Sequence, residues 1–511
     1  MAVSETKCLT TPEAESSRLK RLLVTSLCED KAMRWIKERF QQFDQRFVAV
    51  NESGAVTYAD FLRKVEQWHQ AIQKWGVVSG DRVALVSDYH IDVVALLQAL
   101  MENACIVIPL SEDDRSLFEE RLQTACATKI VTTSARREIV PNTTECRNLV
   151  FDDAGVHPLL EPMVSSGRPG FVIFTSGSTG KGKAVLLDYG RMIQKYRGKI
   201  RGAFRTLLFL KLDHIGGLNT LFSVIFNGGT IVTSPSRQAK DICSCIETYS
   251  VELLPTTPSF LTMLLMSSVY KNHDLSSLKV ITYGTEVMPN STLASLHQSF
   301  PKVALKQTYG LSELGILATK SKASSSNWMK IGGDGFELKV MDGTLWIKSE
   351  QAMLGYLNAP SPFDEYGWYN TGDKVEVDGE YFQILGRESE IINVAGEKVF
   401  PIEVESFLLT VDNVKDVVVR EKRSPVVGQM IWAEFLLEQE EDSVSFKKRV
   451  IEQCQRHLAP FKVPGFITIA EGDTLVGSRF KKIRKGTTDG DAPGSAASAA
   501  DGSAASEPAI A

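Results

Sequence analysis

A short apolar run that leads into a loop of glycines, hydroxyls and lysines constrains this chain more than any other feature. Residues 171–174 read FVIF, which predicts a buried strand, and residues 175–183 follow as TSGSTGKGK. Glycines let backbone N–H groups approach phosphate oxygens closely, hydroxyls donate hydrogen bonds, and lysine neutralises charge. A surface turn can share this composition. A strand leading into so many phosphate-compatible residues nevertheless favours a phosphate-binding loop.

Residues 177–183 also fit G-x-x-x-x-G-K, the beginning of a Walker A loop. That motif continues with a Ser or Thr that binds magnesium, and then with a helix. Here Ala184 follows, and residues 184–187 (AVLL) predict a second strand. A P-loop NTPase is therefore the weaker alternative.

Length and composition predict a cytoplasmic protein of at least two domains. The 511 residues exceed one ordinary core, and the net charge of −5 argues against nucleic acid as the main partner. The eight cysteines include no C-x-x-C pair, which favours reduced thiols. The N-terminus lacks the apolar core of a signal peptide. The most apolar window, residues 93–110, is interrupted by polar residues, so no membrane span is expected.

Strand and helix patterns alternate along the first part of the chain. They predict a hairpin from Phe47, a helix through residues 61–72, a strand after Asp81, a helix over 93–101 and a strand over 106–110. Such alternation predicts an α/β fold with mixed, mostly parallel sheets covered by helices.

Several later blocks accompany the loop in a fixed order. Residues 307–313 read QTYGLSE, residues 371–373 read TGD, and residues 396–405 read GEKVFPIEVE. With the loop, these blocks resemble the adenylate-forming superfamily of acyl-CoA synthetases, peptide-synthetase adenylation domains and luciferases. The family loop is T-S-G-[ST]-T-G-x-P-K-G, and here Gly182 replaces the proline and Ala184 the last glycine.

The resemblance implies two unequal domains. A large N-terminal adenylation domain would span residues 1–387, of which 1–30 look peripheral. A small, mobile α+β domain would span residues 388–485 after a hinge near Ser389, where the family usually has Asp or Lys. Residues 486–511 are rich in Ala, Ser and Gly and are expected to be disordered.

The resemblance also implies a site for ATP built from separated segments. The loop would hold the β- and γ-phosphates, and Tyr309 would offer its ring to adenine. Ser312 would contact the α-phosphate, and Glu313 would bind Mg²⁺ as a hard oxygen ligand. Asp373 would accept both ribose hydroxyls, and Arg387 would contact ribose and phosphate. The predicted nucleotide-binding set is Thr175, Ser176, Gly177, Ser178, Thr179, Gly180, Lys183, Gly284, Thr285, Glu286, Tyr309, Gly310, Ser312, Asp373 and Arg387.

A cluster at residues 213–219 (DHIGGLN) is interpreted as part of the acyl pocket. The resemblance implies that His214 lines this pocket, although a structural histidine is the alternative. The next position is typically Asp where the substrate is an α-amino acid. Here it is Ile215, which cannot pair with an ammonium group, unless Asp213 takes that role in a shifted register. The predicted acyl pocket is His214, Ile215, Gly216, Gly284 and Tyr309, and Leu253, Leu254 and Phe260 add a weak indication that it is apolar.

Near its end the family carries a catalytic lysine in a G-K-x-x-R setting. The matching text is RFKKIR at residues 479–484, in which Lys481 has the proper spacing and is preferred over Lys482. A solvated basic tail is the alternative. Gly396 would lie in the loop that faces the pantetheine thiol. The predicted catalytic residues are Lys481, Glu313, Ser312 and His214.

These features imply ATP- and Mg²⁺-dependent, AMP-forming activation of a small-molecule carboxylate. The acyl group would then pass to CoA or to the phosphopantetheine arm of a carrier protein. Two alternatives remain: an adenylate-forming enzyme with a non-thiol acceptor, and a non-catalytic nucleotide-binding relative. The retained Lys183, Glu313, Asp373 and Arg387 favour an active enzyme. The sequence identifies neither the acid nor the acceptor.

Overall fold

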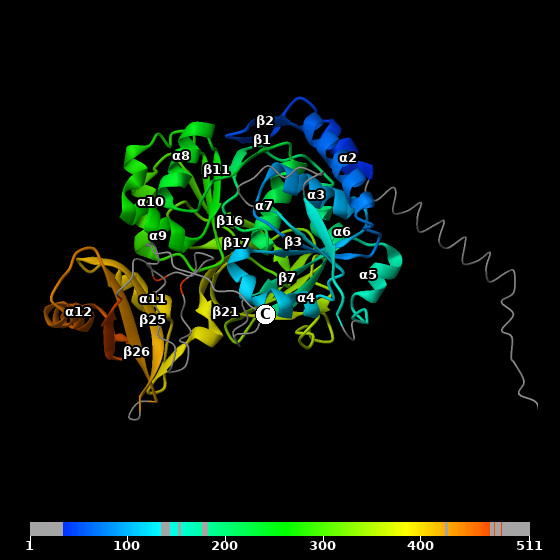
Figure 1. Ribbon diagram of the computed structural model, residues 1–511. Helices are drawn as coiled ribbons and strands as arrows, with labels where there is room; N and C mark the ends of the chain where they lie inside the picture. Colours follow the sequence, from blue (N-terminus) through cyan, green and yellow to red (C-terminus); the bar gives the residue numbers. More distant parts are fainter. Residues whose placement is uncertain are drawn as a thin grey trace, which may run out of the picture.

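The computed structural model describes residues 34–133, 144–151, 155–175, 182–424 and 428–470, together with Leu475 and Lys482. The predicted peripheral residues 1–30 and tail 486–511 lie outside this part of the chain. The described residues form a large lobe, which we define as the residues up to Arg387, and a small lobe after it, drawn in orange to the side of the large one (Figure 1).

Two seven-stranded sheets form most of the large lobe. The strands of the first sheet are β1 (Phe47–Asn51), β2 (Gly54–Thr57), β9 (Arg205–Leu207), β10 (Thr230–Val232), β11 (Leu253–Thr256), β12 (Val280–Tyr283) and β13 (Ala304–Gln307). Those of the second are β3 (Arg82–Val86), β4 (Ile106–Leu110), β5 (Lys129–Thr132), β6 (Glu145–Asn148), β7 (Gly170–Thr175), β8 (Lys183–Asp188) and β20 (Gly355–Tyr356). The strand orders are β13-β12-β11-β9-β10-β1-β2 and β20-β8-β7-β4-β3-β5-β6. Inner pairs are parallel and antiparallel pairs lie towards the edges, so the predicted fold class is confirmed.

Helices cover both faces of both sheets, and three apolar cores lie between the layers. Helices α2 (Tyr58–Lys74), α3 (Ile91–Glu102), α6 (Tyr189–Ile193) and α7 (Ile215–Phe226) pack between the sheets. Helices α4 (Phe118–Thr124) and α5 (Glu161–Ser166) cover the outer face of the second sheet. Helices α8 (Ala239–Tyr249), α9 (Pro258–Ser267) and α10 (Asn290–Ser299) cover that of the first.

This layering explains the continuous apolar run that precedes the glycine-rich loop. Phe171 and Ile173 point into the core between the sheets, while Val172 and Phe174 point into the outer core. A strand covered on both faces has no polar side, so its residues read as one apolar run.

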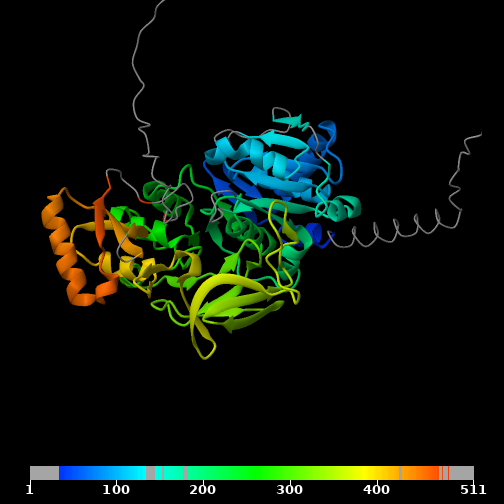
Figure 2. The ribbon, with the colours of Figure 1, turned by 90° about the horizontal axis from the view of Figure 1, so that it is seen from below.

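A third, antiparallel sheet lies beside the two larger ones and was not distinguished by the sequence pattern (Figure 2). Its strands are β16 (Ala318–Ser321), β17 (Met329–Gly332), β18 (Phe336–Met341), β19 (Thr344–Ser349), β21 (Tyr369–Asp378) and β22 (Tyr381–Arg387). Their order is β16-β17-β22-β21-β19-β18. This sheet carries two of the predicted site residues, Asp373 and Arg387.

The small lobe begins with a short 3₁₀ turn, η4 (Glu388–Glu390). Its strands are β23 (Ile392–Val394), β24 (Glu397–Val399), β25 (Val414–Ser424), β26 (Gly428–Leu437) and β27 (Phe466–Ile469). Helices α11 (Pro401–Leu408) and α12 (Ser443–His457) pack on this sheet. No helix among the described residues combines the length and hydropathy needed to cross a bilayer.

Candidate active site

The predicted phosphate loop joins two antiparallel strands of the second sheet. β7 ends at Thr175, β8 begins at Lys183, and these two residues pair directly. A strand rather than a helix follows the loop, so the Walker A alternative is excluded. The predicted loop residues that lie outside the described part of the chain are Ser176, Gly177, Ser178, Thr179 and Gly180.

Asn358 closes the base of this loop. Its side-chain N–H donates to the carbonyl of Gly182 at 2.8 Å, and its side-chain oxygen accepts from the N–H of Ala184 at 2.8 Å. One amide thus satisfies backbone groups on both sides of Lys183. The sequence analysis missed this residue, because a single Asn after a short strand is an ordinary turn signal.

Tyr356 contacts both Lys183 and Glu313. The Lys183 ammonium lies 4.9 Å from the ring centroid of Tyr356, and the Tyr356 hydroxyl donates to Glu313 Oε1 at 2.6 Å. Burial, reinforced by Glu313, raises the pKa of Tyr356 far above its usual range, so the phenol remains a donor at neutral pH. Tyr356 was also missed, since a Gly-Tyr pair carries no motif of its own.

Glu313 has the environment expected of a single-carboxylate magnesium ligand. It is 8% exposed and lies with Ser312 in the turn between β14 (Gly310–Leu311) and β15 (Gly315–Ile316). No described residue donates to its second oxygen. The described residues contain no group of three or more His, Cys, Asp or Glu that could hold a metal. Mg²⁺ commonly takes one or two carboxylates and completes its shell with phosphate and water oxygens. The site fits that pattern, and Glu313 as its ligand stays a prediction.

Asp373 is the centre of a second buried cluster. Asp373 and Arg387 are directly paired across β21 and β22, and the Arg387 Nε lies 3.2 Å from Asp373 Oδ1. The Tyr309 hydroxyl donates to Oδ2 at 2.5 Å. Burial raises the pKa of Asp373, while Arg387 and the Tyr309 hydrogen bond oppose that shift. Since a carboxylate offers about four acceptor sites, this group can still accept from a diol.

The two clusters are parts of one site. Tyr309 and Glu313 belong to one hairpin, and the charge of Glu313 contributes to the raised pKa of Asp373. A side chain at Gly310 would come within 2.7 Å of the Gly315 carbonyl, so this hairpin closes tightly only with glycine. The structure therefore brings together these predicted residues: Lys183, Tyr309, Gly310, Ser312, Glu313, Asp373 and Arg387.

The segment after β12 has a strained backbone. A Cβ at Gly284 would lie 2.3 Å from Thr308 Oγ1, and Thr285 adopts a φ of +72°. A positive φ is rare for a β-branched residue and is associated with functional sites. Both carboxylate oxygens of Glu286 accept hydrogen bonds from protein groups, Ser259 and Lys482. An interaction of this segment with the nucleotide stays a prediction.

His214 caps α7, and its Nδ1 accepts from the N–H of Gly216 at 3.0 Å. A Cβ at Gly217 would lie 2.0 Å from the carbonyl of Lys211, so protein atoms occupy that space. His214 and Gly216 as pocket residues stay predictions.

Three of the four residues that suggested an apolar pocket lie in packed cores. Ile215 is 4% exposed in the core between the two large sheets. Leu254 and Phe260 are fully buried in the core beneath α8, α9 and α10, whereas Leu253 is half-buried. Packing accounts for the hydrophobicity of the three buried residues, and an apolar acyl pocket stays a prediction.

The small lobe presents its two predicted elements differently. Gly396, at the tip of the β23–β24 hairpin, is exposed with a φ of +96°, and no described residue lies within 4 Å of its added Cβ. Ser389 is exposed in η4, between the last strand of the third sheet and the first strand of the small lobe. Lys481 lies outside the described residues, whereas Lys482 is described and buried against the small lobe.

Two family models match the chain. A model of the AMP-binding enzyme family matches residues 36–357. A model of the AMP-binding enzyme C-terminal domain matches residues 403–478. The first match alone spans more than half of the chain.

Curated proteins of similar sequence match this chain over most of their own length. An indoleacetate–CoA ligase from Aromatoleum aromaticum is 26% identical over 478 residues, which is 84% of this chain and 92% of the relative. A 2-succinylbenzoate–CoA ligase from Bacillus pumilus is 26% identical over 466 residues, with coverage of 85% and 93%.

Solved structures of similar fold are more distant in sequence. An anthranilate CoA ligase in complex with anthranoyl-AMP has a TM-score of 0.73 at 18% identity, covering 88% of this chain and 95% of that one. An amide bond synthetase from Marinactinospora thermotolerans has a TM-score of 0.66 at 19% identity, with coverage of 88% and 97%. At this identity the likeness concerns the fold.

Proposed function

The chain belongs to the AMP-binding enzyme family, and from this membership we propose that it is an AMP-forming acid–thiol ligase with CoA as the acceptor. In the first half-reaction a carboxylate oxygen attacks the α-phosphorus of ATP. The bond to the bridging oxygen breaks, pyrophosphate leaves, and an acyl-adenylate forms. In the second, a thiolate attacks the acyl carbonyl and AMP leaves with both electrons of the broken bond.

The observation that carries this proposal is the convergence of two buried carboxylates from separate segments. Asp373 retains acceptor sites for a ribose diol, and Glu313 retains an oxygen for a cation. Lys183, at the base of the glycine-rich loop, adds a positive charge beside the ring of Tyr356, whose hydroxyl donates to Glu313. Such an arrangement suits a nucleotide with Mg²⁺, because fixed charges stabilise the negative charge that spreads over phosphate oxygens in phosphoryl and nucleotidyl transfer.

Bound Mg²⁺ would supply charge neutralisation on the phosphate oxygens and would be held by Glu313. The chain's own groups supply the rest. Arg387 and Tyr309 orient Asp373, and Tyr356 orients Glu313. Lys481 is proposed to bridge the acid and the α-phosphate. The amine of Lys482 is buried against Asp416, which favours Lys481 for this role.

The arrangement of the lobes supports an orientation for the first half-reaction. Lys482 contacts the large lobe through Glu286, while Gly396 is exposed. Transfer to the thiol would require the small lobe to rotate about the turn containing Ser389 and bring Gly396 towards the site, a hinge motion of the kind that many enzymes use.

CoA is the proposed acceptor because the similar curated proteins are CoA ligases. An aromatic carboxylic acid is the proposed substrate class, since several relatives are named for indoleacetate, succinylbenzoate and coumarate. A transfer to an amine is the second candidate, favoured only by the similarity to an amide bond synthetase.

Acid-dependent exchange of pyrophosphate into ATP tests the first half-reaction. A panel of aryl, aryl-alkyl, fatty and amino acids is expected to give exchange with aryl or aryl-alkyl acids. AMP release is then compared with CoA, with a holo carrier protein and with a simple amine. If the protein binds ATP but gives no exchange with any acid, the proposed ligase activity is contradicted and a non-catalytic nucleotide-binding role is favoured. Faster AMP release with the carrier or the amine would replace CoA as the acceptor.

A further inference from the structure

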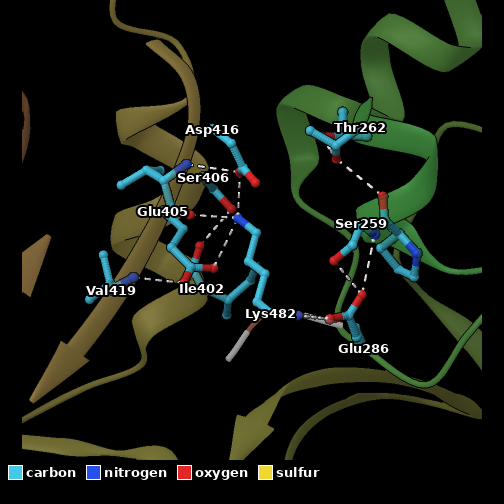
Figure 3. A network of polar contacts seen from close by, with 12 residues as sticks. Ser259, Thr262, Glu286, Ile402, Glu405, Ser406, Asp416, Val419 and Lys482 are labelled. Carbon is cyan, nitrogen blue, oxygen red and sulfur yellow. Dashed lines mark hydrogen bonds and ion pairs between the residues drawn. The ribbon is translucent and has the colours of Figure 1, made fainter. Parts of the chain in front are cut away.

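The motif near the C-terminus contains two adjacent lysines, Lys481 and Lys482. Spacing alone favoured Lys481 for the catalytic role. The structure describes Lys482, whose amine is turned into the small lobe (Figure 3). It donates to the Val417 carbonyl at 2.6 Å and lies 3.0 Å from Asp416 Oδ1 and 3.7 Å from Glu405 Oε2. The Lys482 side chain is 5% exposed and those of the two acids 6% and 0%. This amine is therefore an anchor within the small lobe.

The backbone of the same residue contacts the large lobe. The N–H of Lys482 donates to Glu286 Oε1 at 2.8 Å. The other oxygen of Glu286 accepts from Ser259 in the first turn of α9, from the N–H at 3.2 Å and from the hydroxyl at 2.7 Å. Figure 3 shows Glu286 between these two partners. We call Ser259, Glu286 and Lys482 the cross-lobe contact.

The backbone before Glu286 restricts where its carboxylate can lie. Glu286 follows the strained Thr285, and Gly284 is packed against Thr308, so the backbone that carries the carboxylate is constrained. Hydrogen bonds to a charged acceptor are roughly twice as strong as neutral ones. Each oxygen of Glu286 serves a different lobe, so one side chain fixes the distance between α9 and Lys482.

We propose that Glu286 is a positioning residue of the adenylation step, acting through the backbone of Lys482. This inference rests on the proposed function. The amide N–H that donates to Glu286 belongs to the peptide bond joining Lys481 to Lys482. In this proposal the contact therefore acts on Lys481, the residue proposed to bridge the acid and ATP, through one shared peptide bond. Lys482 fixes the segment to the small lobe, and Glu286 fixes it to the large lobe. Only the second attachment must break when the small lobe rotates for thioester formation.

The test compares Glu286→Ala and Glu286→Gln in the full-length protein. The first half-reaction is followed by acid-dependent pyrophosphate exchange, and the second by CoA-dependent AMP release from preformed acyl-adenylate. Glu286→Ala is expected to slow exchange by about 30-fold, the loss of a charged hydrogen bond. It should slow the second half-reaction at least about 10-fold less. Glu286→Gln keeps one acceptor oxygen and is expected to recover part of the exchange activity.

Matched variants separate positioning from general damage. Glu247→Gln removes an exposed carboxylate outside the contact and is expected to affect exchange less than about 3-fold. Ser259→Ala removes one of the two donors from α9 and keeps the contact with Lys482, so it is expected to slow exchange less than Glu286→Ala does. Equal loss of both half-reactions in Glu286→Ala, or no loss in either, overturns the proposal.

Deuterium uptake tests the contact independently of activity. In the protein without substrates, the peptide containing Lys482 is expected to exchange at least about 5-fold faster in Glu286→Ala than in Ser259→Ala. Identical uptake overturns the cross-lobe contact even if the wild-type protein activates no acid. Conversely, wild-type exchange activity with an unaffected Glu286→Ala variant overturns the positioning role alone.

Discussion

Two carboxylate-centred networks, one around Asp373 and one around Glu286, differ in which parts of the protein hold them together. The cluster of Tyr309, Asp373 and Arg387 lies within the large lobe, where the register of β21 and β22 places Asp373 opposite Arg387. The cross-lobe contact joins two lobes through one carboxylate, Glu286. A network built on strand pairing stays intact when the small lobe moves. A contact made by a single bridging carboxylate can break and release the small lobe. The first suits a ligand held throughout the reaction, and the second suits a group needed in one step.

The largest expected effect is on the network that stays intact. Asp373→Asn keeps the side-chain volume but removes the charge that lies beside Arg387 and that we propose accepts the ribose hydroxyls. Both half-reactions are expected to slow by about 100-fold, or about 2.7 kcal/mol, because the AMP moiety is bound in each. Pyrophosphate exchange and AMP release from preformed acyl-adenylate measure the two steps. Asp378→Asn, an exposed position on the same strand, is the control. A loss confined to one step would contradict the comparison.

The next effect concerns the turn between the lobes. Ser389→Pro fixes φ near −65° and restricts the preceding residue, so it is expected to hinder rotation of the small lobe. Overall turnover with CoA should fall by about 30-fold, while exchange falls by less than about 5-fold. Ser389→Ala should retain both activities. If exchange and turnover fall together in Ser389→Pro, the turn is not the hinge.

A smaller effect is expected at the hydroxyl that orients Asp373. Tyr309→Phe removes one hydrogen bond to the carboxylate and should weaken ATP use by about 5- to 10-fold. It also removes a group that lowers the pKa of Asp373, so the acidic limb of the pH–activity profile should move to higher pH. Tyr381→Phe, on β22 of the third sheet, is the control. An unchanged acidic limb would show that Asp373 does not titrate in that profile.

The raised pKa of Asp373 also makes the stability of the protein depend on pH. The pKa of Asp373 is raised above its ordinary value of 3.8, so the native state binds this proton more tightly than the unfolded chain. Its contribution to stability is therefore present at low pH and is lost as pH rises through the native pKa. The difference in unfolding free energy between wild type and Asp373→Asn should vary with pH in this direction.

The smallest effect is expected in the anchor of Lys482. Asp416→Asn retains an oxygen for the amine, and Glu405 still supplies a negative charge. Exchange should fall by about 3-fold, with little change in the second half-reaction. Glu421→Gln on the same strand is the control. A larger loss in the second half-reaction than in exchange would contradict a role of the Lys482 anchor in the first half-reaction.

The sequence predicted the site best where residue type and spacing determine the chemistry. The glycine- and hydroxyl-rich loop, the block around Glu313, and Asp373 and Arg387 were each singled out from short motifs, but the pairing of Asp373 with Arg387 was not predicted. Tyr356 and Asn358 were not singled out, because they act through contacts with Glu313 and with the loop base, and no local pattern marks such partners. Leu254 and Phe260 were ambiguous for the opposite reason: an apolar residue reads the same in a core and in a pocket.

What the sequence determined by itself was the order of elements and the groups able to bind a nucleotide, since periodicity and side-chain chemistry are local properties. The tertiary structure decided the role of Lys482. Lys481 and Lys482 are adjacent and chemically identical in the sequence, and only the positions of Asp416 and Glu405 beside the amine, and of Glu286 beside the backbone N–H, show that Lys482 is an anchor. Those three carboxylates lie far from the lysines in the chain, so folding alone brings them together.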